Sequence, residues 1–122
     1  MGSFNIVVLP GDGIGPEVAA AGVSALKVIG EVYGHTFNLD EKRIGGIAID
    51  TDNNPYPEET DKACLAADAV LLGAVGGPKW DLGKMRPEQG LLAVRKSMGL
   101  FANLRPMEVK ASQVHRSPLK RE

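Results

Sequence analysis

The feature that most constrains this chain is the stretch NIVVLPGDGIGPEV at residues 5–18, where an apolar run leads directly into three glycines and a proline. Residues 4–9 are apolar and rich in β-branched side chains, which is typical of a strand buried on both faces of a parallel sheet. Pro16 suits the first turn of a helix, and Glu17 suits its positive end. The stretch therefore predicts a strand, a glycine turn and a helix in succession.

The glycine spacing leaves two interpretations of this turn. Gly11, Gly13 and Gly15 form G-x-G-x-G, whereas the dinucleotide-binding fingerprint is G-x-G-x-x-G with an acid about 20 residues further on. Asp40 is only loosely spaced for that acid. The pattern favours a tight connection that needs unusual backbone angles, and a phosphate cradle is the alternative.

The remainder of the sequence alternates between helical and strand patterns. Helices are predicted at 16–34, 58–67 and 91–99. Strands are predicted around 35–44, as an outer strand, at 68–75 and at 100–106, where Pro106 ends the last one. The segments 45–57 and 76–90 are rich in turn residues and are predicted to be loops. This order predicts an α/β fold with an open, largely parallel sheet and flanking helices.

Composition and charge exclude several kinds of partner. The net charge of −1 and the pI near 6.1 argue against a nucleic-acid surface, and no stretch is long enough to span a membrane. The single cysteine, Cys64, lies in an apolar run, so we expect a buried free thiol and a reducing, cytoplasmic compartment. His35 and His115 have no partners at metal-ligand spacing, so we assign both to structure and predict no metal site.

Candidate ligand-binding residues follow the strand at 68–75. Open parallel sheets bind ligands at the carboxyl ends of their strands, and the loop there contains Gly76, Gly77, Lys79 and Trp80. Further on, Arg95 and Arg105 suit a small dicarboxylate, because a guanidinium binds a carboxylate with two hydrogen bonds. A wide surface loop and two solvated arginines are the alternatives that the residues leave open.

Five segments together resemble the β-decarboxylating dehydrogenase family, and its isopropylmalate branch in particular: LPGDGIGPEV, GGIAID, DAVLLGAVGGPKWD, RPEQGLLAVRKS and LFANLRP. Isocitrate, homoisocitrate and tartrate dehydrogenases share the first of them. The resemblance implies NAD-dependent oxidation and decarboxylation of 3-isopropylmalate, a step of leucine biosynthesis. It also implies a requirement for Mg²⁺ or Mn²⁺ and a homodimer.

The resemblance also implies roles for particular residues. Arg95 and Arg105 match the arginines that bind the substrate carboxylates. Glu88, Leu91 and Leu92 match the segment that faces the isopropyl group and the nicotinamide, whereas isocitrate-type relatives have polar residues there for an extra carboxylate, which an apolar surface would not accept. The residues matching the cofactor-binding set are Ile14, Gly76, Gly77, Pro78, Lys79, Trp80 and Glu88.

The resembled enzymes extend well beyond the segment SPLKRE at 117–122, in which Ser117 and Pro118 suit the start of a helix. Their catalytic tyrosine and lysine and their metal-binding aspartates match nothing here, so we expect no catalytic or metal-ligating residue in this chain and no turnover from it alone. Residues 1–99 are expected to form the first part of the first α/β domain, and 100–122 to begin the second, dimerisation domain. The alternatives are a tartrate-type or isocitrate-type relative, and a non-catalytic fragment that docks with a complementary chain.

Overall fold

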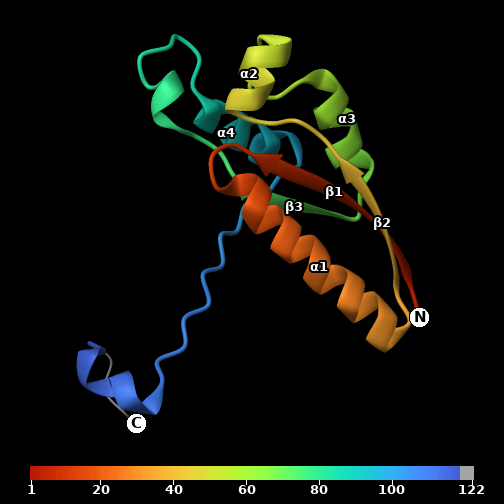
Figure 1. Ribbon diagram of the computed structural model, residues 1–122, viewed down its shortest axis with the longest axis vertical. Coiled ribbons are helices and arrows are strands. Elements are labelled where there is room, and N and C mark those ends of the chain that lie inside the picture. Colours follow the sequence, from red (N-terminus) through yellow and green to blue (C-terminus); the bar gives the residue numbers. More distant parts are fainter. Residues whose placement is uncertain (119–122) are drawn as a thin grey trace.

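The computed structural model describes residues 1–118 and contains an open sheet of three parallel strands (Figure 1). The central strand is β1 (Ser3–Gly11), which pairs with β2 (Thr36–Glu41) on one side and with β3 (Ala69–Ala74) on the other. In this register Ile6 lies between Leu39 and Ala69. The expected parallel α/β sheet, with an outer strand at β2, is confirmed.

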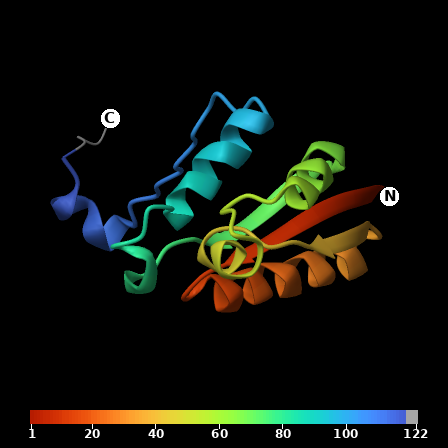
Figure 2. The ribbon, with the colours of Figure 1, turned by 90° about the horizontal axis from the view of Figure 1, so that it is seen from above.

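Helices cover both faces of the sheet. Figure 2 shows α1 (Gly15–Tyr33) on one face, and α3 (Glu58–Ala66) and α4 (Pro87–Ser97) on the other. The short helix α2 (Gly46–Asp52) lies near the carboxyl ends of the strands (Figure 1). Two 3-10 turns complete the described elements: η1 (Pro78–Trp80) and η2 (Ala111–Arg116).

The buried strand β1 divides its side chains between two layers. Val7 and Leu9 belong to the main core, which also contains Ile44, Cys64 and Val94. Ile6 and Val8 are also buried. Successive strand residues point to opposite faces, and the face that holds Ile6 and Val8 is the one covered by α1. This arrangement explains why the first strand is apolar without interruption. The expectation that Cys64 is a buried free thiol is confirmed.

Close backbone packing accounts for the glycines that follow β1. Gly11 has φ +74°, and a Cβ atom there would lie 1.9 Å from the carbonyl oxygen of Ala74 in β3. A Cβ at Gly15 would lie 2.1 Å from the carbonyl oxygen of Pro10. Neither position can hold a larger residue without moving the backbone, because real Cβ atoms do not approach other atoms so closely. The interpretation of this turn as a tight connection is confirmed.

The structure corrects three of the expected elements. Part of the loop expected at 45–57 is the helix α2, and α4 begins at Pro87, inside the loop expected at 76–90. The strand expected at 100–106 is absent. Residues 100–110 run as an extended chain away from the body (Figure 1), and no other strand within residues 1–118 pairs with them. A strand needs a neighbouring strand to pair with its backbone groups. The apolar pattern of residues 100–106 could not show that such a neighbour is missing from the described chain.

The helix expected to begin at Ser117 and Pro118 would lie mainly in residues 119–122, which are outside the described part of the chain. Ser117 itself directly follows η2.

Candidate functional site

Three segments meet at the carboxyl ends of the strands: the glycine turn after β1, the segment that enters α2, and the loop after β3. The residue that joins them is Asp12, whose side chain is almost fully buried. Its carboxylate accepts hydrogen bonds from the backbone N–H groups of Gly46 (2.7 Å), Ile47 (2.7 Å) and Gly76 (3.0 Å). Asp12 was not among the site residues expected from the sequence. The one signal for it was an acid placed between two glycines at the end of a buried strand.

The Asp12 carboxylate explains why α2 forms where a loop was expected. Gly46 and Ile47 are the first two residues of α2, and their N–H groups have no acceptor within the helix. A negative charge at this end also matches the helix dipole. Because Asp12 occupies both amides, they are not free to hold a phosphate.

The loop after β3 is attached to α2 at a second point. Asp50 accepts hydrogen bonds from the Lys79 ammonium (2.6 Å) and from the Trp80 indole N–H (3.1 Å). These two bonds, that from Lys79 first, hold the pKa of Asp50 below its usual range. The Lys79 Nζ atom also lies 5.2 Å from the centroid of the Trp80 ring. Lys79 and Trp80, expected to line a cofactor, are thus both bonded to α2.

One face of α4 carries three of the expected substrate residues. Glu88, Leu92 and Arg95 are spaced i, i+4 and i+7, which places them along one side of a helix, and all three are exposed. Glu88 lies beside the loop, since a Cβ at Gly76 would be 3.1 Å from its Oε1 atom. Leu91, in contrast, is half-buried and packs against the main core. The structure therefore separates Leu91 from Leu92.

The two arginines occupy different surroundings. Arg95 lines a cavity of about 300 Å³ together with the start of the extended segment, Leu100 to Asn103. Arg105 lies further along that segment, is exposed, and does not line the cavity. Neither arginine forms an ion pair within residues 1–118. Ile14, in the glycine turn, is also exposed. Within the described chain, therefore, Arg95 is grouped with Glu88 and Leu92, and Arg105 is not.

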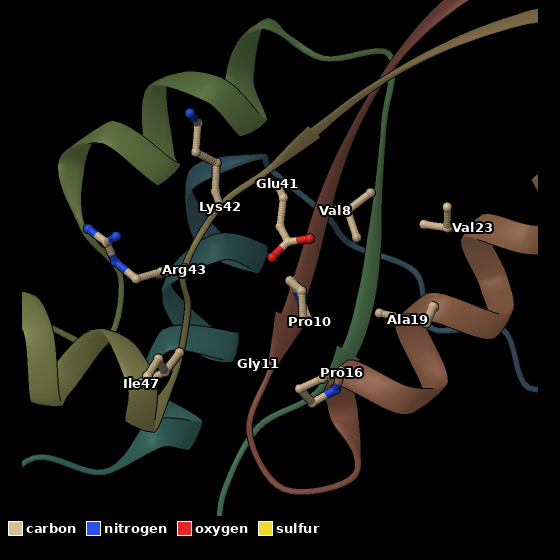
Figure 3. Close-up of a pocket in the computed structure, with 11 residues that line it drawn as sticks. Val8, Pro10, Gly11, Pro16, Ala19, Val23, Glu41, Lys42, Arg43 and Ile47 are labelled. Atoms are coloured by element: carbon tan, nitrogen blue, oxygen red, sulfur yellow. The ribbon is translucent and has the colours of Figure 1, made fainter.

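A larger groove of about 410 Å³ lies on the α1 side of the sheet (Figure 3). Apolar side chains such as Val8, Ala19 and Ile47 line it. Figure 3 shows Lys42 and Arg43 directed away from the carboxylate of Glu41.

Lys42 and Arg43, the two cations that line this groove, form ion pairs with residues outside it. Lys42 bonds Glu59 at 2.9 Å, and Arg43 bonds Asp52 at 3.0 Å. The bond to Glu59 is the main reason that the pKa of Lys42 is raised. None of the expected site residues lines the groove.

Within residues 1–118, no group of three or more His, Cys, Asp or Glu side chains is placed to hold a metal ion. His35 accepts a hydrogen bond from the Gly2 N–H at 3.1 Å, and its ring lies edge-on to Phe4, which is a structural role. No helix in this part of the chain has the length and apolar character needed to cross a membrane.

The fold and this edge define an open parallel α/β domain whose loops gather at the carboxyl ends of the strands, where such domains bind ligands. The family described as isocitrate/isopropylmalate dehydrogenase matches residues 5–122. A 3-isopropylmalate dehydrogenase of Listeria innocua is 54% identical over 120 residues, which cover 98% of this chain and 34% of the relative. One of Bacillus thuringiensis is 54% identical over 117 residues, covering 96% and 33%.

A solved structure shows the same relationship. The apo β-decarboxylating dehydrogenase of Thermococcus kodakarensis is 33% identical to this chain, with a TM-score of 0.66, and the match covers 80% of this chain and 27% of that one. The chain belongs to the isocitrate/isopropylmalate dehydrogenase family. It spans about a third of the length of the curated relatives that it matches.

Proposed function

We propose that this chain supplies part of an NAD-dependent enzyme that oxidises and decarboxylates 3-isopropylmalate, a step of leucine biosynthesis. The observation that carries the proposal is the 54% identity to relatives named 3-isopropylmalate dehydrogenase over nearly the whole chain. The exposed face of α4 supports it, because apolar Leu92 stands between Glu88 and Arg95. An extra substrate carboxylate buried against Leu92 would lack a partner, whereas an alkyl group would not.

The chemistry requires a substrate held in one orientation. Removal of a hydride and a proton from the hydroxyl-bearing carbon and its oxygen gives a ketone β to a carboxylate. Loss of CO₂ then sends the freed electron pair toward that ketone, and a proton returns to the carbon. NAD⁺, when bound, supplies the hydride acceptor. In this proposal Arg95 binds a substrate carboxylate, Arg105 contributes a second cation, and Leu92 contacts the isopropyl group.

The two glycines of the loop after β3 leave room for a cofactor to approach the backbone. Gly76 has φ +115°, and neither Gly76 nor Gly77 has a side chain between the backbone and a ligand. We propose that these glycines, with Pro78, Lys79, Trp80, Glu88 and Ile14, line the NAD site. The described residues offer no group that fits Mg²⁺ or Mn²⁺, so we assign the metal no ligand here and derive no step through it.

We also propose a cytoplasmic homodimer for the whole enzyme, with a domain boundary near Gly99, where α4 has ended. The family resemblance supports both statements. The catalytic tyrosine and lysine implied by that resemblance match no residue of this chain, so we expect the isolated 122 residues to have no turnover.

The test is a chimera in which these residues replace the matching third of the Listeria innocua relative. We expect NADH formation with 3-isopropylmalate and Mg²⁺ or Mn²⁺. Arg95→Gln should raise KM for 3-isopropylmalate about 10- to 100-fold, because one hydrogen-bonded ion pair is lost. Lys96→Gln, in the same helical turn, is the matched control and should leave KM unchanged.

Three results would count against the proposal. A folded chimera without activity would overturn it. Preference for isocitrate or tartrate would assign the chain to a different relative. An unchanged KM in Arg95→Gln would remove Arg95 from the substrate site.

A further inference from the structure

The carboxylate of Asp12 is the one point through which three segments of the strand edge are joined. It extends from the turn after β1 and accepts N–H groups from the start of α2 and from the loop after β3. Its partners are 34, 35 and 64 residues away in the sequence. Among the described residues, a backbone hydrogen bond from Asp12 to Ala74 joins the turn to the end of β3, but none joins α2 to the loop. The relative position of the loop and α2 therefore depends on side chains, and the Asp12 carboxylate is the one that also reaches the turn.

The backbone around Asp12 is shaped to admit a carboxylate. Gly45 has φ +78°, and a Cβ atom there would lie 2.5 Å from the Oδ2 atom of Asp12. A side chain at position 45 would therefore displace the carboxylate. An ionised carboxylate accepts several hydrogen bonds and donates none, which matches a site that contains three N–H donors.

The first part of the loop after β3 is linked to α2 at two points. Asp12 holds Gly76, the second residue after β3, and Asp50 holds Lys79 and Trp80. The Trp80 ring also packs directly on Gly46, where a Cβ atom would lie 2.4 Å from the ring. The loop is therefore fixed to α2 through Asp50 and Trp80, and Asp12 holds both the start of α2 and Gly76.

We propose that Asp12 is a positioning residue for the cofactor site: through Gly76 it holds the loop after β3 in the conformation in which its backbone and Glu88 face the cofactor. Asp12 itself contacts no cofactor in this proposal. The inference rests on the proposed function for the identity of the ligand, but the link from Asp12 to the loop rests on the geometry alone.

The link is tested by amide hydrogen exchange in the isotope-labelled 122-residue chain. The Gly76 amide lies outside every helix and strand and donates to Asp12, so it should be protected in the unaltered chain. Asp12→Ala should raise its exchange about tenfold or more, as expected when one hydrogen bond to a charged acceptor is lost. In Asp12→Asn the Gly76 amide should exchange at a rate between those of the unaltered chain and Asp12→Ala, because the one amide oxygen of asparagine can keep the bonds to Gly46 and Gly76.

Asp68→Asn is the matched control. The Asp68 carboxylate also accepts a backbone N–H, that of Asn5 at 2.8 Å, but it lies at the opposite end of the sheet. The Gly76 amide should exchange at the unaltered rate in this variant. Unprotected exchange at Gly76 in the unaltered chain would overturn the proposal even if Asp12→Ala fails to fold.

The effect on the cofactor is tested in the chimera described above. Asp12→Ala and Asp12→Asn should measurably raise KM for NAD, by up to about tenfold. KM for 3-isopropylmalate should stay nearly unchanged. A purely structural role would lower kcat through loss of folded enzyme and leave both KM values alone, and that result would overturn the proposal. If the unaltered chimera is inactive, the proposed function fails, and the exchange measurements still decide whether Asp12 holds the loop.

Discussion

At the scale of single residues, the glycines after β1 differ in what they provide. Gly11 and Gly13 both have positive φ, at +74° and +56°. A Cβ atom at Gly11 would overlap the Ala74 carbonyl, whereas the nearest atom to a Cβ at Gly13 lies at 3.8 Å. Gly11 is therefore needed for backbone angle and for space, and Gly13 only for the angle.

The two alanine variants separate these requirements. Gly13→Ala should lower the free energy of unfolding by about 1–2 kcal/mol, the cost of a left-handed residue with a Cβ atom. Gly11→Ala should cost clearly more, because β1 and β3 must move apart where they meet. Urea denaturation followed by circular dichroism measures both. Equal losses would show that the close approach of Gly11 to Ala74 contributes nothing.

At the scale of secondary structure, α2 illustrates how contacts from outside a segment create a helix. It has only seven residues, and helices of this length are not stable by themselves. Asp12 satisfies its first amides, Arg43 pairs with Asp52 at its end, and Asp50 bonds the loop after β3. The helix is therefore a product of the assembled strand edge.

The link between α2 and the loop should depend on pH. Bonds from Lys79 and Trp80 lower the pKa of Asp50 in the folded chain. Their contribution is therefore complete above the ordinary carboxyl pKa of 3.8 and is lost as the pH falls through the lower folded value. We expect the emission of Trp80, the single tryptophan, to shift to longer wavelength only in that acidic range.

Two aspartate-to-asparagine variants on α2 check whether the pH dependence comes from Asp50. Asp50→Asn should show the shifted emission of Trp80 already at pH 7. Asp52→Asn, on the same helix, should not, because Asp52 bonds Arg43 rather than the loop. An unshifted spectrum for Asp50→Asn at neutral pH would contradict the prediction.

At the scale of the whole molecule, much apolar surface is left uncovered by the described residues. Val28, Val32 and Tyr33 of α1 are more than half exposed, and the outer edge of β3 has no neighbouring strand within residues 1–118. Exposed apolar patches and unpaired strand edges promote association.

The isolated 122-residue chain should therefore self-associate in a concentration-dependent way. Sedimentation velocity at increasing protein concentration measures this. Val32→Lys should reduce the association, whereas Glu31→Lys, the neighbouring change on the same helix, should reduce it less. A chain that stays monomeric at every concentration would contradict the expectation.

Particular residues show how far the sequence could predict the fold and the site. The continuous apolar run at 4–9 indicated a buried parallel strand, and Pro16 and Gly34 marked the ends of α1, where Gly34 is the left-handed cap. Leu91 and Leu92 were grouped as neighbours in the sequence, yet a helix turns by about 100° per residue. Leu91 therefore faces the core and Leu92 the surface. Asp12 was missed because its partners are remote in the sequence.

By itself, then, the sequence determined the succession of strands and helices at 4–97 apart from α2, the tight turn after β1 and the family, since each depends on local pattern or on matched motifs. Only the tertiary structure decided that α2 forms, that the strand expected at 100–106 does not, and that Asp12 joins the strand edge. These features depend on whether a distant segment supplies a hydrogen-bond partner. A local pattern records which groups need partners, and only the folded chain shows where those partners lie.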